Sequence, residues 1–181
     1  ALLRALRHPA EKCLRAASVF LLSRLGNKTG VYSIDATALP VADASVDAVL
    51  LLGPLYHLVD ALERQQALRE ALRVLRPGGW LFAAAISRWA SLLVAMSLGL
   101  FKDESFAAIV ERDVREGQHR NSTDHLTYFT TAYFHRPDEL RGEIADAGFQ
   151  LQGRYGLEGP GGWLADVDER IKSGDSALDA A

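Results

Sequence analysis

The chain has 181 residues, of which 49% are hydrophobic and 24% charged, which is the composition of an ordinary globular domain with a core of its own. Its formal net charge is −3, so it lacks the concentrated basic surface that nucleic-acid binding usually needs, and we expect no nucleic-acid partner. The single cysteine excludes an internal disulfide, and no cysteine and histidine cluster has the spacing of a zinc site. We therefore expect a cytoplasmic protein without a bound metal.

The N-terminal third predicts helix first and then a short strand. Residues 2–25 repeat apolar side chains at helical spacing, and Pro9 interrupts them, which predicts a short helix and a second one from about Ala10. Residues 31–34 are a short β-prone run. Residues 35–45 are rich in small residues and predict a loop.

The middle of the chain predicts a strand, a helix and a second strand. Residues 46–52 form a nearly continuous apolar run, which is typical of a buried parallel strand with helices on both faces. Asp60 is a good N-cap for a helix that must end before Pro77. Residues 77–79, Pro-Gly-Gly, predict a tight turn, and residues 80–86 predict the second strand. The order indicates a right-handed βαβ unit.

The second half predicts mostly helix. The apolar stretch at residues 89–101 is too short to span a bilayer, so we expect no membrane partner and interpret the stretch as a buried helix, with an interfacial or lid helix as the alternative. The further predicted elements are helices over residues 104–116 and 137–147 and a strand over residues 149–157. The whole chain, residues 1–181, is interpreted as one domain: a core at 30–86, a helical insert on the substrate side at 87–136, and a C-terminal helix and strand at 137–165.

Three short motifs follow one another in the βαβ unit. They read DATALP at residues 35–40, ASVDAV at 44–49 and RVLRPGGWL at 73–81. In this order and spacing they resemble the middle of the class I, Rossmann-like S-adenosylmethionine-dependent methyltransferases, whose pattern runs D-A-x-x-L-P, F-D-x-V, L-x-P-G-G. The resemblance implies an α/β fold, in the form of a partial Rossmann-like methyltransferase fold with a mostly parallel sheet flanked by helices. It also implies S-adenosylmethionine as cofactor and methyl transfer to a small-molecule substrate.

The resemblance implies cofactor contacts at two places. The acidic residue matching Asp35 accepts a hydrogen bond from the adenine amino group in the family, and the next amide, that of Ala36, contacts the ring. The alternative is that Asp35 only caps its own loop. Leu52, Gly53 and Pro54 match the turn that lines the methionine part of the cofactor, and the alternative is a plain turn that ends a strand.

The acceptor side is expected to involve histidines and aromatic residues. His57 follows the second cofactor turn and is the candidate base, because its ordinary pKa lies near neutrality, although a histidine packed at a helix start is the alternative. Residues 117–135 combine histidines and aromatic residues that can line a pocket or merely anchor a surface segment. The candidate substrate-binding residues are Tyr56, His119, Asn121, Tyr128 and Tyr133.

The family's glycine-rich cofactor loop and the acidic residue that holds the ribose are not found in the sequence. Residues 1–30 contain only Gly26 and Gly30, and these do not follow a predicted strand. The expectation is a fragment, an internally deleted relative or one piece of a split protein, with weak or no cofactor binding. Without the family's first two strands, residues 31–34 and 46–52 would pair directly or leave a gap in the sheet.

Two other functions stay open at this point. The first is a non-catalytic, methyltransferase-like binding or dimerisation module that uses residues 89–101 as an interface helix, which leaves a homodimer open. The second is a nicotinamide-binding Rossmann domain, which the missing Gly-x-Gly-x-x-Gly turn disfavours.

Overall fold

The computed structural model describes residues 18–22, 31–33, 35–123, 125 and 128–157. The chain divides into two compact units, residues 1–150 and 151–181, which are treated separately. Among the described residues, every helix and strand belongs to the first unit.

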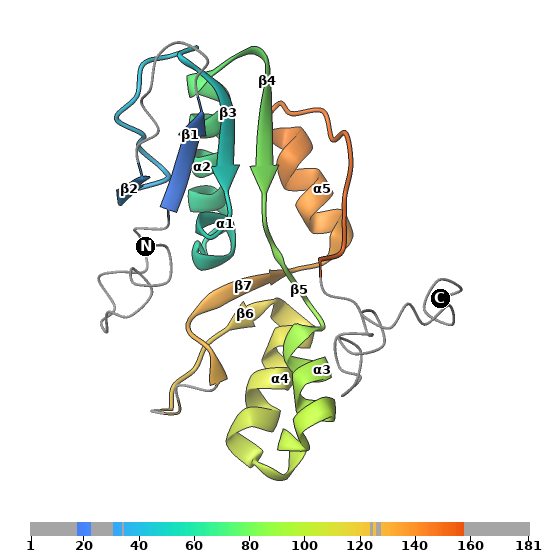
Figure 1. Ribbon diagram of the computed structural model, residues 1–181. Helices are drawn as coiled ribbons and strands as arrows, with labels where there is room; N and C mark the ends of the chain where they lie inside the picture. The colour runs from blue at the N-terminus through green and yellow to red at the C-terminus, as the bar shows by residue number, and fades with distance from the viewer. Residues whose placement is uncertain (1–17, 23–30, 34, 124, 126–127, 158–181) are drawn as a thin grey trace, which may run out of the picture. The chain divides into compact units, whose positions relative to one another are not determined.

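A four-stranded sheet forms the first part of this unit (Figure 1). Its strand order is β2-β1-β3-β4, and the parallel pair β3–β4 places Val49 opposite Leu81. β1 lies antiparallel to both of its neighbours. The bounds are β1 (Ser18–Leu22), β2 (Val31–Ser33), β3 (Val46–Leu51) and β4 (Leu75–Ala83).

The helix predicted over residues 2–25 is wrong where the structure describes it, because residues 18–22 form β1. A five-residue apolar run satisfies helical and strand patterns alike, and here the backbone hydrogen bonds of two neighbouring strands decide. The prediction that β2 and β3 pair directly or leave a gap is also wrong, since β1 fills that position. The other residues of the predicted helix lie outside the described ones.

Two helices connect β3 to β4. Helix α1 (Pro54–His57) follows β3 directly, and α2 (Ala61–Val74) follows α1. The Asp60 carboxylate accepts hydrogen bonds from the amides of Leu62 and Glu63, at 2.7 and 3.2 Å, which confirms the predicted N-cap. The predicted turn at residues 77–79 is instead part of β4, where Gly78 has φ +80° beside a register shift in the β3–β4 pair.

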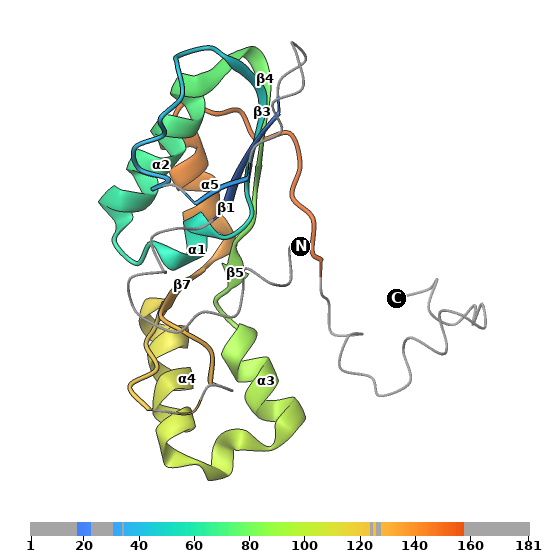
Figure 2. The same ribbon diagram turned by 60° about the vertical axis from the view of Figure 1, so that its left-hand side comes forward.

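The core of this unit lies between the sheet and one layer of helices. α2 contacts both β4 and α5 (Pro137–Asp146), and Figure 2 shows both helices on the same side of the sheet. Val49 of β3 and Ile144 of α5 belong to one apolar cluster, and each such buried aliphatic side chain contributes about 1.5–3 kcal/mol.

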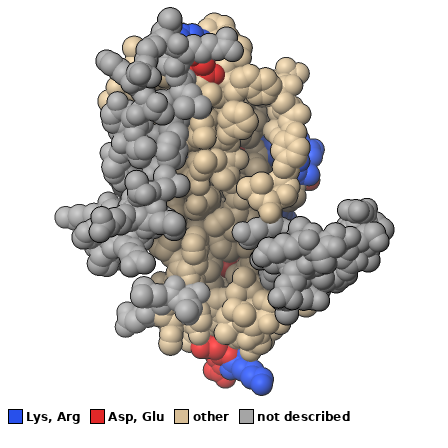
Figure 3. Space-filling model, in the orientation of Figure 1, with Lys and Arg blue, Asp and Glu red and all other residues tan. Residues whose placement is uncertain are grey.

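On the opposite face of the sheet, Trp80 and Phe82 are 54% and 53% exposed. In the face shown in Figure 3, the described charged side chains gather mostly at the rim. Helices were expected on both faces of the sheet. Among the described residues, α2 and α5 cover one face, and no helix covers the face of Trp80 and Phe82.

The helical insert carries a small sheet of its own. The strand order is β5-β7-β6, with β5 (Ile86–Ser87) parallel and β6 (Gln118–His119) antiparallel to β7 (Ala132–His135). Helices α3 (Ala90–Leu98) and α4 (Glu104–Glu116), joined by the 3-10 helix η2 (Leu100–Lys102), form a second apolar cluster. The predicted helices of this region are thereby confirmed. The expectation that the helix within residues 89–101 is buried is wrong, because Ser91 and Ala95 are the buried residues of α3 and its other described side chains reach the surface at least in part. Among the described residues, no helix is long and apolar enough to cross a membrane.

The predicted strand over residues 149–157 is wrong, because this stretch forms no strand and pairs with no strand of the described chain. Residues 151–157 are exposed, and an apolar pattern becomes a strand only where another strand accepts its hydrogen bonds. The expected fold class, α/β with parallel strands flanked by helices, is confirmed.

Candidate functional site

The cofactor residues expected from the sequence lie at one edge of the larger sheet. β2 and β3 both run antiparallel to β1, and β4 runs parallel to β3, so these three strands end at the same edge. Asp35 follows β2, and Leu52 follows β3. Ligands of α/β sheets bind at the carboxyl ends of the strands, so this edge is the candidate site.

The loop that begins at Asp35 is built on a local turn. Its carboxylate Oδ1 accepts hydrogen bonds from the amide and hydroxyl of Thr37, at 2.9 and 2.6 Å. Asp35 is exposed, whereas the neighbouring Ala36 is 2% exposed. The structure therefore shows the local cap directly and presents an exposed carboxylate beside a buried alanine.

Helix α2 holds the far end of the same loop. The amide of Leu39 donates to Glu70 at 2.9 Å, and its carbonyl accepts from Arg73 at 2.9 Å. The bond from Arg73 is the largest cause that lowers the pKa of Glu70, so the carboxylate is charged at neutral pH. Both backbone groups of Leu39 are satisfied from one helix, which fixes the loop against the core.

The second cofactor turn leads straight into α1. Gly53 is its N-cap and makes no side-chain cap, and Pro54 occupies the first turn, where its missing N–H costs nothing. Pro54 and Leu55 are buried, while Leu52 is 47% exposed. The Tyr56 hydroxyl donates to the Leu52 carbonyl at 3.2 Å, so the turn is closed by its own helix.

His57 ends α1 beside the segment that precedes β7. Its Nδ1 lies 3.4 Å from the carbonyl oxygen of Thr131, which can only accept, so Nδ1 carries the hydrogen and Nε2 a lone pair. Burial lowers the pKa of His57, and the bond to Thr131 opposes this only in part. The rings of Tyr56 and Phe129 lie near the imidazole, with centroids 4.7 and 6.3 Å away. His57 is thus a neutral imidazole at neutral pH.

Phe129 also belongs to this group; it lies in the region 117–135 that was expected to line a pocket but was not among the candidate substrate-binding residues. Its φ is +64°, a left-handed conformation that is strained for a bulky side chain. The side-chain amide of Asn121 donates to the carbonyls of Phe129 and His125, at 3.0 and 2.9 Å, and holds the loop in this shape. Asn121 therefore supports the loop from within.

The remaining predicted substrate residues are held in packing contacts. His119 is 1% exposed, and its two nitrogens lie 2.7 Å from an Asp113 oxygen and from the carbonyl of Tyr128. The Tyr128 ring is buried, and its hydroxyl donates to Asp103 at 2.5 Å, which raises the pKa of Tyr128. These two residues join the loop to α4 and to its N-cap, Asp103.

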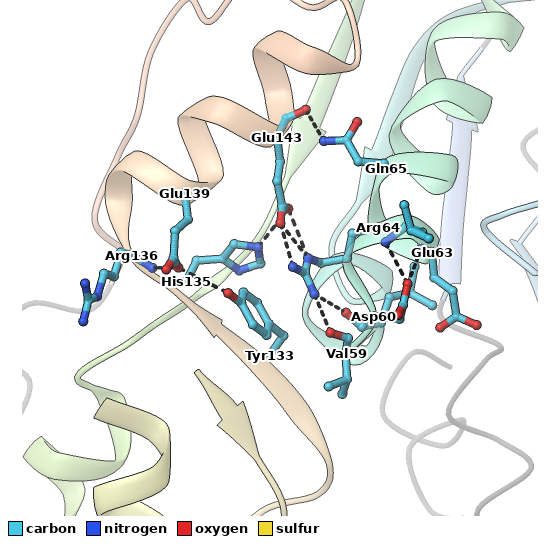
Figure 4. A network of polar contacts seen from close by, with 12 residues as sticks. Val59, Asp60, Glu63, Arg64, Gln65, Tyr133, His135, Arg136, Glu139 and Glu143 are labelled. Atoms are coloured by element: carbon cyan, nitrogen blue, oxygen red, sulfur yellow. Dashed lines mark hydrogen bonds and ion pairs between the residues drawn. The ribbon is translucent and has the colours of Figure 1, made fainter. Parts of the chain in front are cut away.

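Tyr133 belongs to a buried polar network between α2, α5 and β7 (Figure 4). The guanidinium of Arg64 lies 3.7 Å from the centre of its ring, and Arg64 also binds Glu143. Arg64 was not among the candidate residues, although its position gives a signal: it shares the helix face of Ala67, Leu68 and Ala71, all fully buried. An arginine on an apolar helix face needs a buried partner.

Among the residues that the structure describes, no three histidine, cysteine, aspartate or glutamate side chains come close enough together to hold a metal ion.

The family model "Methyltransferase domain" matches residues 13–83, which contain the loop of Asp35, the turn at Gly53 and α1. The chain belongs to the class I S-adenosylmethionine-dependent methyltransferases. This methyltransferase-family chain is 34% identical over 125 residues to the ubiquinone/menaquinone biosynthesis C-methyltransferase UbiE of Acidiphilium cryptum. The match covers 69% of this chain and 47% of the relative, so the chain spans about half the length of the curated relative that it matches.

A solved structure agrees with the fold of this methyltransferase-family chain. An S-adenosylmethionine-dependent methyltransferase from Methanosarcina mazei matches 72% of this chain and 60% of its own, with 24% identity and a TM-score of 0.50. A possible histamine N-methyltransferase from Thermotoga maritima matches 65% of this chain and 44% of its own, with 25% identity and a TM-score of 0.41. The family's cofactor is S-adenosylmethionine.

Proposed function

We propose that this chain takes part in S-adenosylmethionine-dependent methyl transfer to a small-molecule acceptor. The observation that carries the proposal is the convergence of the Asp35 loop and the turn at residues 52–54 on one carboxyl edge of the sheet, next to a neutral His57. The similarity to the C-methyltransferase UbiE supports a small-molecule acceptor.

The residues at this edge fit the adenine and methionine sides of the cofactor. In the proposal, the exposed carboxylate of Asp35 accepts from the adenine amino group while Oδ1 keeps its bond to Thr37, and the amide of Ala36 contacts the ring. Leu52, Gly53 and Pro54 line the methionine part, where the absent Cβ of Gly53 lets backbone approach a ligand. The bound cofactor supplies an activated sulfonium methyl group, so the chain's task is positioning and exclusion of water.

On the acceptor side we assign the proton-accepting role to His57. Its Nδ1 is occupied by Thr131, which leaves the lone pair of Nε2 to take a proton from an acceptor oxygen or nitrogen. Tyr56 and Phe129 flank the imidazole as apolar walls. In this arrangement the segment that carries these walls is held in place by four further residues: Asn121, His119, Tyr128 and Tyr133.

Calorimetry with S-adenosylhomocysteine tests the proposal. Because the described residues supply only part of a family cofactor site, we expect a weak dissociation constant of about 0.1–1 mM. Micromolar binding would contradict this expected weakness and show a complete cofactor site in the chain. The absence of any heat at millimolar ligand would contradict the proposal itself.

A second candidate function is a dimerisation module without catalysis. One observation favours it: the large apolar side chains around α3 and η2 are exposed, with Met96 at 64%, Leu98 at 68% and Phe101 at 48%. Exposed apolar patches of this kind mark interaction surfaces. Size-exclusion chromatography with light scattering distinguishes the two functions, since a strict monomer at about 0.1 mM protein contradicts the module.

A further inference from the structure

The carboxyl end of α1 is held from outside the helix. The Nη1 atom of Arg64 donates to the backbone oxygens of Leu58 and Val59, at 3.0 and 2.8 Å. Leu58 is the C-cap of α1 and follows His57 directly. A helix of four residues has too few internal hydrogen bonds to be stable alone, so these external bonds decide where its last turn lies.

The guanidinium that makes these bonds is itself held by Glu143 and Tyr133 (Figure 4). Its Nε and Nη2 atoms donate to the carboxylate of Glu143 on α5, at 2.7–3.1 Å. The ring of Tyr133 packs against its face, and His135 lies 3.1 Å from the second oxygen of Glu143. The Arg64 side chain is 3% exposed, so water does not compete for these bonds.

The side chain of Arg64 thus contacts the neighbours of both His57 and Thr131, the two residues that lie against each other at Nδ1 and the carbonyl oxygen. On one side it binds the residues that follow His57, and on the other it packs against β7, which follows Thr131. We propose that Arg64 is a positioning residue, which sets the contact between His57 and the Thr131 carbonyl by holding the end of α1 to β7. This deepens the proposed function and rests on it where it gives His57 a role in proton transfer.

Lysine cannot replace arginine in this position. The lysine ammonium is a single point charge that can bind either the carboxylate of Glu143 or the carbonyls of Leu58 and Val59. The planar guanidinium of arginine donates hydrogen bonds to both at once. With Arg64→Lys we expect the end of α1 to loosen and His57 to become more hydrated. Because burial lowers the pKa of His57, hydration raises it toward its ordinary value.

The experiment is a histidine NMR titration of the full chain, with the His57 signal assigned by its loss in His57→Asn. Arg73→Lys is the matched control, because Arg73 also lies in α2 and makes the same kind of fork, to Glu70 and the carbonyls of Leu39 and Val41. We expect Arg64→Lys to raise the pKa of His57 and Arg73→Lys to leave it unchanged. In a methyl-transfer assay, Arg64→Lys is expected to lower kcat about tenfold or more and change KM less than about twofold.

An unchanged His57 titration in folded Arg64→Lys overturns the proposal, and so does an equal shift in Arg73→Lys, which would indicate general loosening of the fold. If Arg64→Lys does not fold, Glu143→Gln takes its place, because it removes the anchor of the guanidinium; the same upward shift is expected, and no shift overturns the proposal. If the wild-type protein transfers no methyl group, the proposed function fails but the role of Arg64 is still tested, because the titration of His57 does not depend on activity.

Discussion

His119 and Asp113 form a buried pair, in which Nδ1 of the imidazole lies 2.7 Å from Oδ2 of the carboxylate. The other ring nitrogen lies 2.7 Å from the carbonyl of Tyr128. The imidazole therefore joins α4 to the segment leading to β7. The same carboxylate oxygen accepts from Ser91 of α3 at 2.6 Å, so one aspartate ties together three parts of the insert.

Asp113→Asn is expected to destabilise the protein by about 1–3 kcal/mol, because it replaces the buried carboxylate that bonds His119 and Ser91 with a neutral amide, whose NH2 group cannot accept their hydrogen bonds. Urea unfolding followed by circular dichroism measures this. Glu111→Gln on the same helix is the control: Glu111 pairs with Arg115 at the surface, where solvent screens the charges, and we expect almost no change. Equal effects of the two substitutions would contradict a special role of the buried pair.

Two glycines should respond to alanine in opposite directions. Gly117 caps α4 at φ +76°, and an added Cβ would lie 2.6 Å from the carbonyl oxygen of Phe134, so Gly117→Ala is expected to cost about 2 kcal/mol or more. Gly142 lies inside α5 with open space around a Cβ, so Gly142→Ala is expected to stabilise by about 0.5–1 kcal/mol. Thermal unfolding of both variants checks the two signs, and a stabilised Gly117→Ala would show that the cap is relaxed.

The stability of the protein should fall in acid through Glu143. Burial alone would raise the pKa of Glu143, but hydrogen bonds from His135 and Arg64 outweigh it, so its pKa lies below the ordinary value of 4.5. A lowered pKa in the folded state gives stability that is complete above the ordinary value and is lost as pH falls through the lowered one.

Glu143→Gln isolates this contribution. The variant is expected to be less stable than wild type at about pH 6, and the difference in Tm is expected to shrink as the pH falls below 4.5 and the carboxylate of Glu143 takes up a proton. Melting curves across this range measure it. A difference that stays constant with pH would mean that the charge of Glu143 does not stabilise the fold.

The two roles of Asp35 can be separated by substitution. Thr37→Val removes the hydroxyl bond to Oδ1 but leaves the carboxylate, whereas Asp35→Asn removes its charge. If Asp35 binds adenine, Asp35→Asn should weaken S-adenosylhomocysteine binding about 5- to 10-fold, and Thr37→Val should change it less than about twofold. Calorimetry compares them, and an equal loss in both variants would indicate that Asp35 acts only through its loop.

Much of the fold could be predicted because its signals are local. Asp60 shows an N-cap by its residue type, Pro77 limits α2 from one side, and the period of residues 104–116 predicts α4 with the bounds that it has. The strand at residues 18–22 was missed for the opposite reason, since its conformation depends on pairing with β2 and β3. The order of the motifs indicated the family, which the comparisons confirm.

What the sequence by itself determined is the chemistry available at the carboxyl edge: an acidic residue after one strand, a Gly-Pro turn and a histidine after the next. What only the tertiary structure decided is which side chains are free to act. His119 and Tyr133 match an acceptor site by residue type, but His119 is bonded to the buried Asp113, and Tyr133 packs against the buried Arg64 of α2. Burial makes the difference, because a polar group removed from water must take a protein partner, and the partner that it takes is set by packing between segments far apart in the chain.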